Sequence, residues 1–139
     1  MKASLIVALV VAFCIAAYVY TGSKPVWQFD NLERNTKKVI TAAELQRWAT
    51  NLLAMYPTNS RVRLSELGTN FPQQLRYLAP KLGPYIWLYD DPDTNTPRWV
   101  RLYWGSGFLG AHGFEIGPPT FVSQRPGRAW APGVYFYDK

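Results

Sequence analysis

His112 is the only histidine of the chain and the residue best suited to acid–base chemistry, with Glu115 as its nearest carboxylate in the sequence. With Ser106 it could form a nucleophile and base. A spacing of three on a strand, however, places His112 and Glu115 on opposite faces, and no G-x-S-x-G elbow surrounds Ser106. One histidine without a cysteine partner is also a poor transition-metal site. A small hydrolase-type enzyme that uses His112, with Glu115 or an aspartate of the 90–93 loop, is therefore kept as an alternative.

Two further patterns resemble cofactor or metal motifs but lack the context that the chemistry needs. Residues 105–110 match G-x-G-x-x-G after a predicted strand, yet residues 111–119 cannot form the helix whose start would bind a pyrophosphate. Asp91, Asp93 and Asn95 begin like an EF-hand loop, but the sixth position is not Gly and the twelfth is not Glu. We therefore expect a glycine-rich bend and an exposed hairpin loop, with no cofactor and no metal.

Three predicted strands, at residues 85–89, 98–104 and 133–137, alternate between two kinds of side chain. Successive residues of a strand point to opposite faces of a sheet. One face is apolar and suits a core, with Ile86, Leu88, Val100, Leu102, Val134 and Phe136. The opposite face is aromatic with one arginine, and it carries Tyr85, Trp87, Tyr89, Trp99, Arg101, Tyr103, Tyr135 and Tyr137.

This second set, called the aromatic face below, exposes more aromatic surface than a fully solvated sheet normally does. Either the 118–132 loop with Trp130 covers it, or a partner does. Tyr, Trp and Arg also dominate binding hot spots and stacking platforms. We therefore predict a binding face with no catalytic residue, made of Tyr85, Trp87, Tyr89, Trp99, Arg101, Tyr103 and Tyr135.

A helix over residues 41–56 is the first element expected to support this sheet. Thr41 and Glu44 have the spacing of a capping box, and Ile40 and Leu45 have the spacing of a hydrophobic staple. Apolar residues then recur on one helical face until a proline ends the pattern.

A second, shorter helix is expected to begin at residues 70–72 and to end by Pro80 and Gly83. The period then changes from 3.6 to 2, which predicts four strands at residues 85–89, 98–104, 112–116 and 133–137. Helices followed by strands indicate the α+β class. We expect one or two helices packed on one face of a three- to four-stranded, mainly antiparallel sheet.

Residues 3–20 contain no charged side chain, and as a helix they would span about 27 Å, close to the hydrocarbon core of a bilayer. This predicts an N-terminal transmembrane helix acting as a signal anchor. A cleavable signal peptide and a lipoprotein with its lipid on Cys14 are the two alternatives. The chain is thus divided into a membrane segment at 1–20, a polar tether at 21–38 and one α+β domain at 39–139.

The flanking charges bear on the side of the membrane where the domain would lie. Lys2 favours a cytoplasmic N-terminus, whereas Lys24, Arg34, Lys37 and Lys38 favour the reverse. A short basic start before an apolar run is the usual export pattern. We expect a single-pass protein of the cell (inner) membrane with an exported domain, or a protein secreted after signal cleavage.

The formal net charge is +6, from 15 Lys and Arg against 9 Asp and Glu, and the positive charges form no run. Such a surface can attract an anionic partner but gives no specific signal for nucleic acid. With 16% aromatic residues the chain is not disordered. The expected function is a membrane-tethered, exported, non-enzymatic interaction module for a partner protein or an anionic cell-envelope polymer. Nucleic-acid binding is an alternative if the domain is cytoplasmic.

Overall fold

The computed structural model describes the backbone of residues 2–57, 59–76, 78, 83–106, 110–125 and 127–138, and their side chains except those of 2–5, 19–30, 106, 110 and 138. Within these ranges six strands form one sheet: β1 (Ser60–Val62), β2 (Tyr85–Asp91), β3 (Thr96–Ser106), β4 (Gly110–Ile116), β5 (Gly127–Ala131) and β6 (Val134–Asp138). Their order is β1-β2-β3-β4-β6-β5 and every neighbouring pair is antiparallel.

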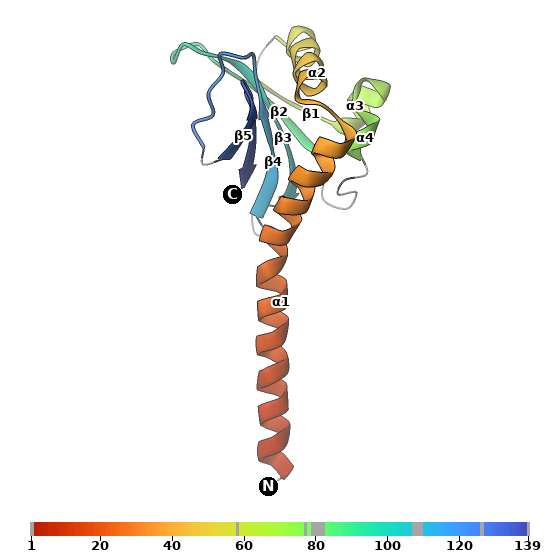
Figure 1. The fold of residues 1–139 in the computed structure, drawn as a ribbon, viewed down its shortest axis with the longest axis vertical. Coiled ribbons are helices and arrows are strands. Elements are labelled where there is room, and N and C mark those ends of the chain that lie inside the picture. Colours follow the sequence, from red (N-terminus) through yellow and green to blue (C-terminus); the bar gives the residue numbers. More distant parts are fainter. Residues whose placement is uncertain are drawn as a thin grey trace.

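The helical elements are α1 (Lys2–Val39), α2 (Ala42–Met55), α3 (Leu64–Leu67), the 3-10 turn η1 (Gly68–Asn70) and α4 (Gln73–Arg76). The C-terminal part of α1 and the shorter helices lie on one side of the sheet, while the N-terminal part of α1 extends away from it (Figure 1). Buried side chains of the helices, such as Leu45 and Leu52, pack in one core with Ile86, Leu102 and Phe136 of the sheet. This arrangement fits the predicted α+β class.

The predicted sheet of three to four strands was too small, because the sheet has six. The missed strand β1 has three residues, too few to show a period of two. The missed strand β5 lies in the Pro-, Gly- and Arg-rich region that was expected to be a loop, and its first three residues are exposed. Both strands lie at the edges of the sheet, where each has only one neighbour to pair with. The helical layer likewise has more elements than the one or two expected.

Helix α1 corrects the prediction for the N-terminal region. Among the residues that the structure describes, no helix combines the length and the apolarity that crossing a bilayer requires. The predicted transmembrane helix or signal anchor at residues 3–20 is contradicted by this finding, and so is the single-pass location in the inner membrane. Residues 21–38 continue the helix.

Helix α2 forms where the sequence predicts it, and the capping box is present. The Glu44 N–H donates to Thr41 Oγ1 at 3.2 Å, and the Thr41 N–H donates to Glu44 Oε2 at 2.8 Å. Ile40 is buried before the cap, and Leu45, Ala49 and Leu52 form the buried face. Local signals therefore fix the start of this helix and the face that it turns toward the sheet.

The capping box predicts a pH-dependent part of the stability. Hydrogen bonds from the Thr41 backbone and then from its hydroxyl lower the pKa of Glu44 below its usual value. The stabilisation is therefore complete above the unfolded-state pKa and is lost as the pH falls through the folded-state pKa. We expect Glu44→Gln to lower the Tm slightly at pH 7, because only the charge is removed from the capping box, and to leave it unchanged in acid. Thermal melts across pH, with Glu66→Gln as the control, check this, and a constant Tm difference down to acid pH would contradict it.

Candidate functional site

The register of β2 and β3 brings the residues of the aromatic face together in opposed pairs. Tyr85 lies opposite Tyr103, Trp87 opposite Arg101, and Tyr89 opposite Trp99. The alternate positions, among them Ile86, Leu88, Val100 and Leu102, are buried in the core beneath the helices. The two faces of the sheet therefore differ as the alternation of the sequence indicates.

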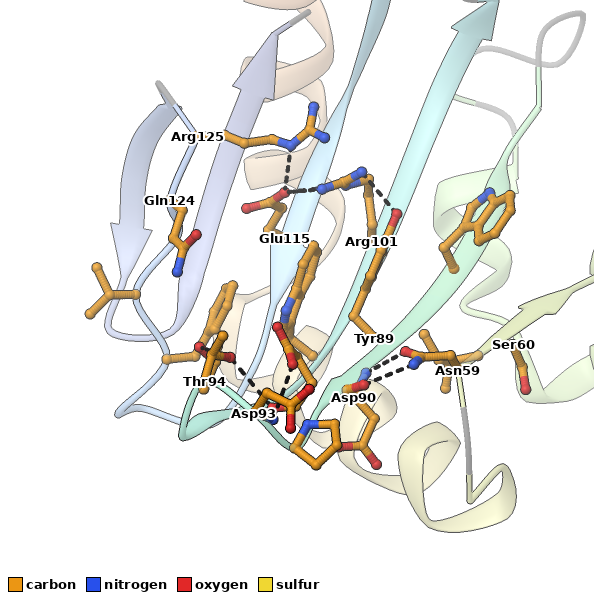
Figure 2. A pocket seen from close by; sticks show the side chains of 18 of the residues that line it. Asn59, Ser60, Tyr89, Asp90, Asp93, Thr94, Arg101, Glu115, Gln124 and Arg125 are labelled. Atoms are coloured by element: carbon orange, nitrogen blue, oxygen red, sulfur yellow. Dashed lines mark hydrogen bonds and ion pairs between the residues drawn. The ribbon is translucent and has the colours of Figure 1, made fainter.

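A cleft of about 900 Å³ crosses part of this face. Half-buried Trp87, Tyr89, Trp99 and Arg101, four of the seven residues of the predicted binding face, line it. Figure 2 shows Asn59 and Ser60 on one side, Gln124 and Arg125 on the other, and Asp93 and Thr94 of the β2–β3 turn at one end. Such a volume lies within the range of small-ligand sites.

Arg101 is held in the cleft by a network centred on Glu115. Its Nη2 and Nε donate to Glu115 Oε1 at 2.8 and 3.2 Å, and its Nη1 donates to the Tyr89 hydroxyl at 2.9 Å. The guanidinium also lies over the rings of Tyr89 and Trp99, at 4.8 and 4.9 Å from their centroids. These contacts fix the position of the arginine before any ligand arrives.

The Glu115 side chain is only 2% exposed, so its charge needs partners. Besides Arg101, the Ser123 hydroxyl donates to Oε2, and Arg125 Nε lies 3.7 Å from Oε1. Two arginines thus share one buried carboxylate, which the dashed lines of Figure 2 connect to both. The network ties β3, β4 and the loop after β4 into one wall of the cleft.

The loop after β4 covers part of the aromatic face through Phe121. Phe121 is 2% exposed and stacks on Trp99 at 5.3 Å between centroids, while Trp99 stacks on Tyr89 at 4.1 Å. The Tyr135 hydroxyl donates to the Phe121 carbonyl at 3.1 Å. The expected cover by Trp130 is absent, because Trp130 stacks on Phe136 and packs against the hydrophobic core.

The other part of the aromatic face consists of Trp87 and the stacked pair of Tyr85 and Tyr103. The Trp87 indole N–H donates to the Tyr103 hydroxyl at 3.2 Å, and Tyr103 stacks on Tyr85 at 5.2 Å. Arg61 of β1 lies opposite Trp87 in the sheet and places its guanidinium 5.8 Å from the Trp87 ring centroid. Arg61 is exposed and lines the cleft together with Trp87.

Tyr137 is the most deeply buried member of the aromatic set. Burial raises the pKa of its phenol strongly, against the opposing effect of Arg101, whose guanidinium lies 5.4 Å from the ring centroid. The phenol therefore stays neutral through the physiological pH range. Tyr137 supports Arg101 from beside the cleft and does not line it.

The residues considered for hydrolysis are not brought together. His112 is buried on the core side of β4, where it pairs with Trp104, whereas Glu115 lies on the aromatic face opposite Arg101. Asp90 lies beside Arg98, with its Oδ2 3.1 Å from Arg98 Nε. The side chain of Ser106 and residues 107–109 lie outside the described part. On either side of them, β3 and β4 pair as neighbouring antiparallel strands.

Residues 92–95, between β2 and β3, form an exposed hairpin turn. The Asp93 N–H donates to Asp91 Oδ1 at 3.2 Å, and Asn95 has a positive φ of 52°. Within the described ranges, no group of three His, Cys, Asp or Glu side chains is arranged to hold a metal ion.

Sequence reasoning missed Arg61, Phe121 and Asn59, which all line the cleft. Arg61 and Asn59 lie at or beside a strand too short to be noticed. The side-chain amide of Asn59 donates to the Asp90 carbonyl and accepts from its N–H, which fixes this end of β1 on β2. An isolated aromatic residue in a Pro- and Gly-rich loop was the only signal for Phe121.

Comparison with known proteins adds no second source of evidence. No protein-family model, curated protein or solved structure matches this chain. The geometry of the cleft is the basis for assigning a function.

Proposed function

We propose that this chain is a non-enzymatic binding domain that holds its partner in the cleft of the aromatic face. The observation that carries this proposal is an open cleft of about 900 Å³ lined by half-buried aromatic side chains and arginines. Aromatic and arginine side chains dominate binding hot spots because they offer large contact areas with few rotatable bonds.

The rigidity of the cleft supports the same proposal. Arg101 is fixed by Glu115 and Tyr89, and the Trp87 ring is fixed by its hydrogen bond to Tyr103. Side chains that are already ordered lose little entropy when a partner binds, so more of the contact energy appears as affinity. The partner protein or polymer expected from the sequence would therefore meet a preformed surface.

Trp87 and Arg61 are better test positions than Trp99 and Arg101. Trp99 lies between Tyr89 and Phe121, and Arg101 neutralises a buried carboxylate, so their removal would disturb the fold. The Arg61 side chain is exposed and makes only ring contacts with Tyr85 and Trp87 among the interactions described.

We expect the double substitution of Arg61→Ala and Trp87→Ala to weaken partner binding about tenfold or more while the domain stays folded. The measurement is retention of labelled protein on immobilised oligosaccharides, peptides and single-stranded oligonucleotides. One class should retain the wild-type chain and release the double variant.

The matched control combines Arg47→Ala on α2 with Trp130→Phe at the core side of the sheet, which keeps a ring against Phe136 and should leave retention unchanged. Near-identical circular dichroism spectra would show that the variants are folded. Retention of wild type and double variant to the same extent on every class would refute the cleft as the binding site.

A further inference from the structure

We propose that the cleft binds an extended peptide segment that carries an acidic and a basic side chain about four residues apart. This inference rests on the proposed binding function and adds the chemical class of the partner. It follows from the charges that the ion pairs of the cleft leave uncompensated and from the positions that the strand register gives to these charges.

One row of residues across the sheet makes one part of the cleft basic. Trp87 of β2 lies in this row between Arg61 of β1 and Arg101 of β3. Glu115 follows on β4, and Arg125 reaches it from the loop after β4. The row therefore holds three arginines against one carboxylate, which is buried between two of them. Arg61 is exposed and makes only ring contacts among the interactions described, so its charge is accessible to a partner.

The β2–β3 turn makes one end of the cleft acidic. Asp91 and Asp93 are exposed and line the cleft, and Figure 2 shows Asp93 at this end. Asp91 Oδ1 accepts the Asp93 N–H at 3.2 Å, and within the described ranges neither carboxylate forms an ion pair. Asp90 differs, because Arg98 compensates its charge. A basic group of the partner would therefore find negative charge at this end.

The strand geometry sets the distance between the two charged regions. Trp87, in the basic row, and Asp91 are both on β2, and their separation along the strand is about 13 Å at the usual rise per residue. An extended peptide covers the same distance in about four residues. One of its side chains can therefore reach the arginines while another reaches the aspartates.

This separation of charge disfavours other polymers as partners. A nucleic acid carries negative charge along its whole length, so part of its backbone would meet the aspartates of the turn. A polycation would meet the arginines in the same way. A neutral oligosaccharide gains no attraction from the polarity of the cleft. A polypeptide can place opposite charges at a fixed spacing on one chain, which is the pattern that this lining complements.

The backbone of such a peptide keeps its hydrogen bonds in an open cleft. Its outward N–H and C=O groups stay in contact with water, so only the inward groups need partners from the protein. The exposed amide of Gln124 and the exposed hydroxyl of Thr94 line the cleft, and both can donate and accept. Binding therefore does not require a free edge of β2 or β3, which are both paired within the sheet.

The test is isothermal titration of the full chain with capped heptapeptides. The opposite-charge peptide is acetyl-Gly-Glu-Tyr-Ser-Tyr-Lys-Gly-amide. Its spacing isomer, acetyl-Gly-Tyr-Glu-Lys-Ser-Tyr-Gly-amide, has the same composition with adjacent charges, and the like-charge controls carry Glu or Lys at both charged positions. At about 50 mM NaCl we expect the opposite-charge peptide to bind about fivefold more tightly than each control, and at about 500 mM NaCl less than about twofold more tightly.

Charge reversal connects this preference to the two regions of the cleft. Arg61→Glu removes the surplus of positive charge from the basic row, so the Lys–Lys peptide should then bind at least as tightly as the opposite-charge peptide. Asp93→Lys cancels the charge of Asp91, so the Glu–Glu peptide should then do the same. Arg47→Glu on α2 and Glu66→Lys on α3 make the same changes of charge at exposed positions outside the cleft and should leave the order of affinities unchanged.

Failure of the peptide proposal can be told apart from failure of the binding function. Equal binding of all the peptides, binding of none, or an order of affinities that survives both Arg61→Glu and Asp93→Lys would each overturn the peptide proposal. If an immobilised oligosaccharide or oligonucleotide nevertheless requires Arg61 and Trp87, the partner class is wrong and the cleft remains the binding site. If no immobilised class requires these two residues, both proposals fail.

Discussion

Replacing Glu115 with alanine should lower the free energy of unfolding by about 3–5 kcal/mol, because it leaves buried positive charge without a partner. The Arg101 side chain is 13% exposed and donates to Glu115 twice, and Arg125 lies on the same carboxylate. Without Glu115 the Arg101 guanidinium keeps only the Tyr89 hydroxyl and aromatic faces as described partners. Urea unfolding at neutral pH measures the loss.

Two variants make this result interpretable. Glu115→Gln keeps an acceptor for Arg101 and Ser123 but removes the charge, so its loss of stability should be smaller. Glu33→Gln removes a carboxylate that bridges Lys37 and Arg128, whose side chains are 42% and 53% exposed, and should cost less than about 1 kcal/mol. A Glu115→Ala protein as stable as Glu33→Gln would show that the network does not hold the wall of the cleft.

Replacing Gly113 with alanine should prevent cooperative folding or lower the free energy of unfolding by more than about 3 kcal/mol. Gly113 lies on β4 opposite Tyr103 on one side and Tyr137 on the other. A Cβ atom there would lie 2.0 Å from the Leu102 carbonyl oxygen and 2.6 Å from the Tyr103 Cα. Both are backbone atoms, so β3 and β4 would have to separate.

The control for this substitution is Gly68→Ala. Gly68 has a positive φ of 51°, but a Cβ there would meet nothing within 4 Å. Its φ and ψ of 51° and −119° form a backbone conformation that L residues seldom adopt, so Gly68→Ala should cost about 1–3 kcal/mol, from backbone conformation alone. Thermal and urea unfolding of both variants separates the two causes, and equal losses would contradict the close approach of β3 and β4 at Gly113.

The parts of the fold that depend on neighbouring residues could be predicted from the sequence. The capping box between Thr41 and Glu44 spans three residues, and it marks the start of α2. The alternation within β2 and β3 separates Trp87 and Tyr89 from Ile86 and its apolar neighbours. In both cases the local geometry of one element decides the pattern.

The parts that depend on distant residues could not be predicted in this way. β1 is recognisable only through its pairing with β2, which places Arg61 opposite Trp87. Arg101 and Glu115 meet because the register of β3 and β4 makes them direct neighbours. Phe121 covers Trp99 because the loop after β4 folds back on the sheet. The sequence contained these residue types, but register and loop path decide which of them meet.

Trp87 gives the most direct test of the cleft as a binding site. Its indole N–H donates to Tyr103 within the aromatic face, and Trp130 offers a second indole packed against the core. Both resonances can be identified in a nitrogen–proton correlation spectrum with Trp87→Phe and Trp130→Phe variants. On titration with the ligand that the immobilised probes select, we expect the Trp87 signal to move until saturation while the Trp130 signal stays in place. Saturable binding that leaves the Trp87 signal unmoved would contradict the assignment of the cleft as the binding site.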